Sequence, residues 1–239
     1  MNIVLFEKDR KQIILNSADY RFRHIKKVLK LEKGDSIKAG VINGKKGTAE
    51  IISISDREIV LETDFREDGC RPLPVYLLAG HPRPPAARRI IRDCTSFSVS
   101  GISFFTAVNS EKSYLQSSLW NKEEYQKALR EGAEQGGHCF IPDLKVYRSL
   151  EEYFRQNDTD EYVKICFERE AGSKEAGKPA AGRTLLAIGP ERGWVDSELE
   201  LLKLKSFQFF SLGDTILRTE TACAAAVSVI NYINNFFRR

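Results

Sequence analysis

The chain has 239 residues, of which 42% are hydrophobic and 29% are charged, as is typical of a globular protein with one large domain or two modest ones. No apolar run reaches the roughly 18 residues that a membrane span requires, and the N-terminal segment turns charged too early for a signal peptide, so we expect a cytoplasmic protein. The formal net charge of +4 is too small to establish nucleic-acid binding, although local clusters of cations still can.

The cysteines and histidines argue against a metal site and against a disulfide framework. The five cysteines are odd in number and far apart, and no pair has the C-x-x-C spacing that would support a zinc site or a disulfide framework. The three histidines, His24, His81 and His138, are not clustered either. We therefore expect reduced, mostly buried thiols and no metal.

Residues 1–68 are predicted to form a small β-barrel with one helix. Short alternating segments are separated by turn signals, and Asn43-Gly44 between two of them strongly indicates a hairpin. A helix is expected from about Ser17, because Phe22 and Ile25 recur at helical spacing. The expected strands are 3–6, 12–15, 36–42, 48–54 and 59–65.

A stretch with prolines and a glycine, 68–74, is predicted to link this domain to a second one, 72–239. Beyond it, apolar strands alternate with helices, which predicts an α/β fold with a mainly parallel sheet. Segment 171–183 is rich in Gly, Ala and Lys and is expected to be a flexible loop. The expected strands are 75–79, 102–108, 162–167, 184–188 and 207–212, and the expected helices lie near 84–97, 121–136, 149–156, 196–205 and 220–237.

Two clusters of basic residues are candidates for RNA binding. Residues 21–30 carry five cations and a histidine but no acid, although charge alone is equally compatible with a solvated helix face. Arginines cluster again at 83–92, and two clusters in two domains favour an RNA clamp. The candidate RNA-binding residues are Arg21, Arg23, His24, Lys26, Lys27, Lys30, Arg83, Arg88 and Arg89.

Polar, glycine-containing loops follow two predicted strands, at 189–194 and 213–221. Parallel α/β sheets bind ligands at the carboxyl ends of their strands, so the two loops suggest one shared pocket. Gly189 and Gly193 allow close backbone approach or a positive φ, yet this loop alone also fits an ordinary strand-to-helix connection. Its spacing matches neither a dinucleotide-binding fingerprint nor a P-loop.

The second loop is harder to explain as structure alone. It places Arg218, Thr219, Glu220 and Thr221 directly before a predicted helix. Helix capping accounts for a threonine and for Glu220, but not for Arg218, because the helix dipole disfavours a cation at this end. A third polar loop begins at Glu168 and is a weaker candidate for lining the same pocket.

Together these motifs resemble the SPOUT methyltransferases that methylate N3 of a uridine in small-subunit ribosomal RNA, the RsmE family. The most specific part of the resemblance is Leu217-Arg218-Thr219-Glu220-Thr221, and Gly189-Pro190-Glu191 with Gly193 agrees with it. Segments near residues 24–35, 134–137 and 168 agree in order, so the resemblance spans nearly the whole chain.

The resemblance implies a PUA-like N-terminal barrel for RNA, a C-terminal α/β domain with a deep trefoil knot, and a homodimer. It also implies that S-adenosylmethionine binds between three loops. The implied cofactor-binding residues are Phe167, Glu168, Ile188, Gly189, Pro190, Glu191, Gly193, Leu212, Gly213, Ile216, Leu217, Arg218, Thr219, Thr221 and Ala222. As candidate catalytic residues, Arg218 would stabilise charge on the uracil carbonyl oxygens and Glu220 would orient the loop or accept the N3 proton.

Two departures from the family pattern bear on the target rather than on the cofactor. Arg192 stands where the family has the first of two glycines, and segment 81–101 differs from the usual start of the α/β domain. The alternatives left open are methylation of another base or of a ribose 2′-hydroxyl, and a non-catalytic RNA-binding protein. A nucleotide hydrolase is disfavoured because a P-loop lysine and metal ligands are lacking.

Overall fold

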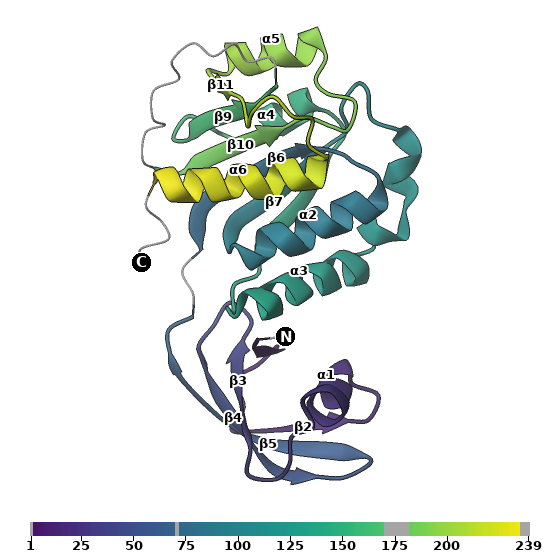
Figure 1. Ribbon diagram of the computed structural model, residues 1–239, viewed down its shortest axis with the longest axis vertical. Coiled ribbons are helices and arrows are strands. Elements are labelled where there is room, and N and C mark those ends of the chain that lie inside the picture. The colour runs from purple at the N-terminus through teal and green to yellow at the C-terminus, as the bar shows by residue number, and fades with distance from the viewer. Residues whose placement is uncertain (1, 70–71, 170–181, 235–239) are drawn as a thin grey trace. The chain divides into compact units, whose positions relative to one another are not determined.

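The computed structural model describes residues 2–69, 72–169 and 182–234 and divides the chain into two compact units (Figure 1). Unit 1 comprises residues 1–71 together with 133–141, and unit 2 comprises 72–132 and 142–239. The expected loop 171–183 lies almost entirely outside the described residues, as do residues 235–237 of the last predicted helix.

Unit 1 is built on a mixed five-stranded sheet with the strand order β1-β3-β4-β5-β2. The pair β1–β3 is parallel and the other pairs are antiparallel, with Asn43 at φ 55° in the hairpin turn between β3 and β4. All five strands expected here are present. Their bounds are β1 Val4–Phe6, β2 Gln12–Asn16, β3 Ser36–Val41, β4 Lys46–Ile54 and β5 Glu58–Glu67.

The expected helix of unit 1 begins later than Ser17. Asp19 is its N-cap and accepts a hydrogen bond from the Arg21 backbone N–H at 2.8 Å, so α1 spans Tyr20–Arg23. The chain continues in a π-helical turn, η1 (His24–Leu29). Phe22 and Ile25 are buried in the same cluster as strand side chains, and this cluster is the core of the unit.

Residues 133–141 belong to unit 1 because they pack against β1. Ala133 and Cys139 are buried in one cluster with Ile3 and Leu5. The Glu134 carboxylate accepts a hydrogen bond from the Tyr20 hydroxyl at 2.8 Å, and the carbonyl of Glu134 accepts one from the backbone of residue 2, also at 2.8 Å. No sequence pattern indicated this docking, since the segment reads as the end of an amphipathic helix.

Unit 2 is a six-stranded, all-parallel sheet covered by helices, so the expected α/β class is confirmed. The strand order is β11-β9-β10-β6-β7-β8. The strands are β6 Leu73–Gly80, β7 Val99–Phe105, β8 Asp143–Tyr147, β9 Val163–Phe167, β10 Thr184–Ile188 and β11 Gln208–Phe210.

The helices of unit 2 cover both faces of this sheet. Helices α4 and α5 bury Leu150, Tyr153 and Leu202 in one cluster with strand residues, and Figure 1 shows α2 and α6 side by side on the other face. The helices are α2 Pro84–Ser96, α3 Lys122–Gly136, α4 Leu150–Gln156, α5 Asp196–Leu204 and α6 Thr219–Ile233, and two 3₁₀ turns span Lys112–Gln116 and Ser118–Trp120.

The described residues agree with the expectation of reduced thiols. Cys94, Cys139, Cys166 and Cys223 are free and buried, and Cys70 lies outside the described residues. Within the described ranges, no helix is long and apolar enough to cross a bilayer, and His, Cys, Asp and Glu side chains form no group that could hold a metal ion.

Candidate functional site

The carboxyl ends of β9, β10 and β11 meet at a cavity of about 820 Å³ in unit 2. The three strands are neighbours in a parallel sheet, so the loops that follow them emerge at the same edge. These loops, at 167–169, 188–194 and 212–222, provide most of the lining. The volume is in the range of small-molecule binding sites.

The cavity brings together nearly all of the residues expected to bind a cofactor. Every one of them except Thr221 lines it, and so do Glu220 and Arg83. The residues that also line it, and that were not candidates from the sequence, are Tyr114, Arg169, Arg192, Trp194 and Thr215. Trp194 follows the glycine loop directly and could have been included on that ground. Tyr114 lies in the 3₁₀ turn Lys112–Gln116 after β7, where no sequence pattern pointed to it.

The loop after β10 is tightly supported by its neighbours. Gly80, at the end of β6, lies so close to Pro190 that a Cβ on Gly80 would be 2.6 Å from the Pro190 backbone nitrogen. The Trp194 ring stacks on Phe105, with ring centroids 5.6 Å apart and planes 13° apart. Gly189 lies against the same indole, because a Cβ there would be 3.0 Å from its Nε1. Both glycines are therefore needed for close packing.

Glu198 fixes the end of this loop. It is 4% exposed and lies in the first turn of α5. Its carboxylate accepts hydrogen bonds from the backbone N–H of Val195 at 3.1 Å and from that of Val108 at 3.0 Å. One buried side chain therefore joins the loop after β10 to the segment after β7.

His81 lies beside this supported loop, immediately after Gly80. It is 1% exposed, and its ring centroid is 4.5 Å from that of Trp120 and 6.0 Å from that of Phe104. Neither ring nitrogen has a hydrogen-bond partner among the described residues. Burial lowers the pKa of His81 to about 4, so the ring is neutral at pH 7.

The loop after β11 is far less supported. Ser211 Oγ hydrogen-bonds the backbone N–H and carbonyl of Gly213, both at 3.1 Å. Gly213 has φ +113°, and a Cβ on it would meet open space. Ile216 lines the cavity and yet is 82% exposed. This side of the cavity therefore presents an uncovered apolar side chain to a ligand.

The two candidate catalytic residues stand at the start of α6. Arg218 is the N-cap residue of α6, and no side chain accepts a capping hydrogen bond there. Capping by a threonine, the structural alternative for this loop, therefore does not occur. Arg218 is exposed, and its side chain has no hydrogen bond or ion pair within the part of the chain that the structure describes. The Glu220 side chain is 11% exposed, and its Oε1 lies 3.7 Å from Nη1 of Arg89.

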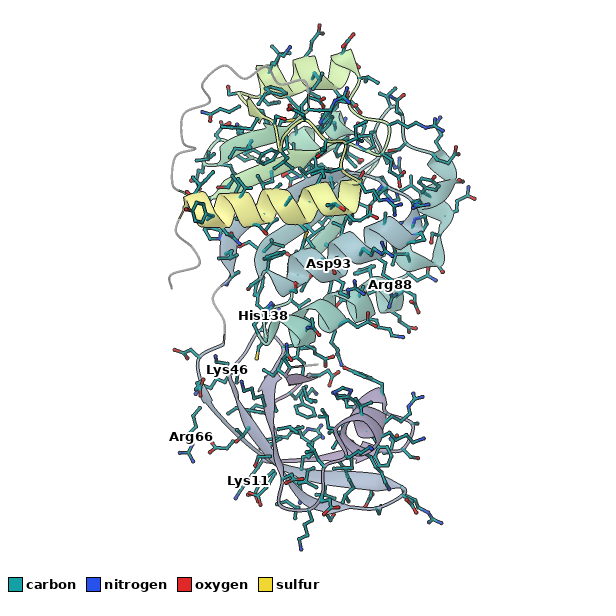
Figure 2. All side chains as sticks on the ribbon, viewed as in Figure 1. Lys11, Lys46, Arg66, Arg88, Asp93 and His138 are labelled. Atoms are coloured by element: carbon teal, nitrogen blue, oxygen red, sulfur yellow. The ribbon has the colours of Figure 1, made fainter. Side chains whose placement is uncertain are left out.

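The basic cluster on α2 is engaged in ion pairs within unit 2. Nε of Arg83 lies 3.7 Å from Oε1 of Glu191, and Arg89 pairs with Glu220 as described above. Arg88, labelled in Figure 2, binds two carboxylates of α3, those of Glu124 at 3.3 Å and Glu131 at 3.2 Å. These candidate RNA-binding residues hold helices and loops together, so the structure does not present them as uncommitted cations.

The basic cluster of unit 1 divides into engaged and uncommitted residues. Arg21 binds both carboxylate oxygens of Asp19, at 2.7 and 3.0 Å, and is only 12% exposed. Lys26 donates to Asp56 at 2.7 Å. Burial lowers the pKa of His24, so this ring is neutral at pH 7.

Three cations of this cluster, by contrast, are uncommitted. Arg23, Lys27 and Lys30 are exposed and form no ion pair or side-chain hydrogen bond within the described ranges. These three are the residues of the predicted cluster that remain available to bind phosphate.

The chain matches the family model of an RNA methyltransferase domain over residues 70–231 and that of an RNA methyltransferase PUA domain over residues 19–64. It is 36% identical to ribosomal RNA small subunit methyltransferase E of Treponema pallidum, with 96% of this chain and 90% of that protein covered. It is 31% identical to ribosomal RNA small subunit methyltransferase E 1 of Borreliella burgdorferi, with 95% of each covered.

The fold agrees with a solved structure. The crystal structure of a ribosomal RNA small subunit methyltransferase E from Neisseria gonorrhoeae bound to S-adenosyl methionine matches with a TM-score of 0.80, and 98% of both chains is covered at 20% identity. At this identity, the likeness establishes a common fold.

Proposed function

The chain belongs to the family of ribosomal RNA small subunit methyltransferase E, and we propose that it methylates N3 of a uridine in small-subunit ribosomal RNA with S-adenosylmethionine as the methyl donor. The observation that carries the proposal is the cavity in which three strand-end loops meet Arg218 and Glu220. The names of the two relatives support ribosomal RNA as the substrate, and the matching PUA domain supports RNA binding. The loop motifs support N3 as the target atom.

The residues present fit S-adenosylmethionine. The cavity of about 820 Å³ has room for it, and Phe167, Ile216 and Leu217 provide apolar surface. Residues 188–193 and 212–217 would hold the cofactor. When bound, it supplies a methyl group on a positively charged sulfur, which an incoming nucleophile attacks in line.

The protein's own contribution is to position the base and to manage charge. Methylation at N3 requires that the N3 proton leave, and the resulting negative charge would spread onto the uracil carbonyl oxygens. The uncommitted guanidinium of Arg218 would stabilise these oxygens. The carboxylate of Glu220, held by Arg89, would accept the proton.

The exposed face of α6 supports a homodimer through unit 2. Tyr232 is 78% exposed and Val229 is also exposed, while Cys223 and Ile230 face the core of the unit. A second copy of the chain covering this face would remove the two exposed side chains from water.

The decisive variant is Arg218→Ala. If Arg218 stabilises the developing charge, kcat should fall about 100- to 1,000-fold, or about 3 to 4 kcal/mol, while the affinity for S-adenosylmethionine stays within twofold. Methyl-uridine formation would be followed by mass spectrometry and cofactor binding by calorimetry. Sedimentation of both proteins should give twice the chain mass.

The controls separate this function from its alternatives. Arg155→Ala removes an exposed arginine of α4 outside the cavity and should leave kcat unchanged. A methyl group found on ribose or on another base would replace the proposed target but keep the chemistry. A wild-type protein that binds RNA and not the methyl donor would be a non-catalytic relative. Near-normal turnover of Arg218→Ala would exclude the role given to this residue.

A further inference from the structure

The charged residues that line the cavity differ in whether they have partners. Arg83 is paired with Glu191 and Glu220 with Arg89, at 3.7 Å in each case. Arg192 also lines the cavity. It is exposed, and its side chain, like that of Arg218, makes no hydrogen bond or ion pair with any residue that the structure describes. Arg192 and Arg218 are therefore two guanidinium groups at one opening that no residue within the described ranges neutralises.

The backbone that carries Arg192 is held in place. The Gly193 N–H donates to the Pro190 carbonyl at 2.9 Å, which closes a turn with Glu191 and Arg192 at its two central positions. Gly193 has φ +74°, a conformation that favours glycine. Glu191 is drawn to Arg83, both by the ion pair and by a hydrogen bond from the Arg83 backbone N–H at 3.3 Å. The side chain of Arg192, its neighbour in the turn, has no acidic partner in the part of the chain that the structure describes.

An exposed, uncommitted guanidinium on a fixed turn is suited to binding phosphate. It is planar, always charged and less strongly hydrated than an ammonium group, and it binds phosphate oxygens in a bidentate geometry. A base that is methylated in a cavity must leave its stack, while the phosphates on either side of it stay at the opening.

We propose that Arg192 binds a backbone phosphate beside the target nucleotide and so positions the RNA over the cavity. The inference rests on the proposed function, since it takes the ligand to be the RNA substrate. In this arrangement Arg218 contacts the target base and Arg192 contacts the RNA backbone. A carboxylate of the cofactor is the competing ligand for Arg192, and RNA is favoured because Arg192 is exposed at the opening.

The test measures RNA affinity against salt concentration for the wild type, Arg192→Ala and Arg192→Lys. The probe is the small ribosomal subunit or its extracted RNA, whichever the wild type methylates. Loss of one phosphate contact should weaken binding several-fold and reduce the slope of log affinity against log salt by about 0.7, the value for one phosphate of single-stranded RNA. Arg192→Lys should recover most of the slope, because a lysine still neutralises one phosphate.

Two further measurements separate the possible failures. Arg155→Ala removes the same charge from α4 and should leave the slope unchanged, so a general effect of net charge would show there. Calorimetry with S-adenosylmethionine should give the same Kd for Arg192→Ala and for the wild type. An unchanged slope, or weaker cofactor binding with normal RNA binding, would overturn the role of Arg192. A wild type that methylates neither RNA probe would instead count against the proposed function.

Discussion

The two loops that face each other across the cavity are built in different ways. The loop after β10 is packed against its surroundings, with Pro190 on Gly80, Trp194 on Phe105 and Glu198 holding the backbone behind it. The loop after β11 is held by the local hydrogen bonds of Ser211 near its start and leaves Ile216 uncovered.

This difference separates what stabilises the protein from what binds the ligand. Contacts on the β10 side exist in the free protein, so their loss should lower the free energy of unfolding. Contacts of Ile216 would form with a ligand, so their loss should lower affinity and leave unfolding unchanged. Variants on the β10 side should therefore lower the free energy of unfolding, whereas a variant at Ile216 should lower the affinity for the ligand and leave unfolding unchanged.

The largest effect is expected from His81, on the packed side. The pKa of this ring is lowered from 6.5 to about 4 by burial, so above pH 6.5 the ring is neutral in both the folded and the unfolded chain. As pH falls from 6.5 to 4, only the unfolded chain gains the proton. The free energy of unfolding should therefore decrease by about 3 kcal/mol over this range on account of His81.

The variant His81→Phe isolates this contribution. A phenyl ring suits a site between Phe104 and Trp120 and does not titrate. Urea unfolding at several pH values would give the difference between wild type and variant, in which the carboxylates common to both cancel. As pH falls, the free energy of unfolding of the wild type should decrease relative to that of His81→Phe. Parallel curves would mean that His81 is not in a dry site and would weaken the description of this side as packed.

The second prediction concerns Glu198→Ala. The substitution removes two hydrogen bonds that a carboxylate accepts from the N–H groups of Val195 and Val108, which should cost about 2 kcal/mol of unfolding free energy. Because the loop after β10 loses its anchor, cofactor affinity should fall as well. Glu200→Ala, at an exposed position of the same helix, is the control and should change neither quantity by more than about 0.5 kcal/mol. Equal stability of the two variants would contradict the anchoring role.

The sequence predicted best those elements whose burial is complete. Strand β10 is buried at every position, and its bounds were predicted without error from its apolar run. Strand β8 was missed because it is an edge strand, in which only Tyr147 is buried and no apolar run is left. Segment 133–141 was missed as part of unit 1, since a helical pattern does not say which partner it packs on.

The candidate site likewise has features that the sequence predicts and features that it does not. The glycines and polar residues of the loops could be read from the sequence, because they follow strands that were themselves predictable. The partners of the arginines could not, since Arg88 binds Glu124 and Glu131 and Arg89 pairs with Glu220, far along the chain. A count of basic residues therefore does not show which of them already form ion pairs within the protein.

The smallest effect, and the one that most directly tests the open side, is expected from Ile216→Ala. The side chain is 82% exposed, so its truncation removes almost no contact from the free protein, and the free energy of unfolding should stay within about 0.5 kcal/mol of the wild type. If the cofactor covers Ile216, the affinity for S-adenosylmethionine should fall about fivefold, or about 1 kcal/mol. Calorimetry and urea unfolding measure the two quantities.

Leu204→Ala is the matched control for this last comparison. Leu204 is 81% exposed at the end of α5 and does not line the cavity, so its truncation should change neither stability nor affinity. Since Ile216 and Leu204 have almost the same exposure, a difference in affinity between their variants reports the ligand alone. Loss of stability in Ile216→Ala with normal affinity would show that the loop after β11 is packed in solution, and the contrast between the two sides of the cavity would then fail.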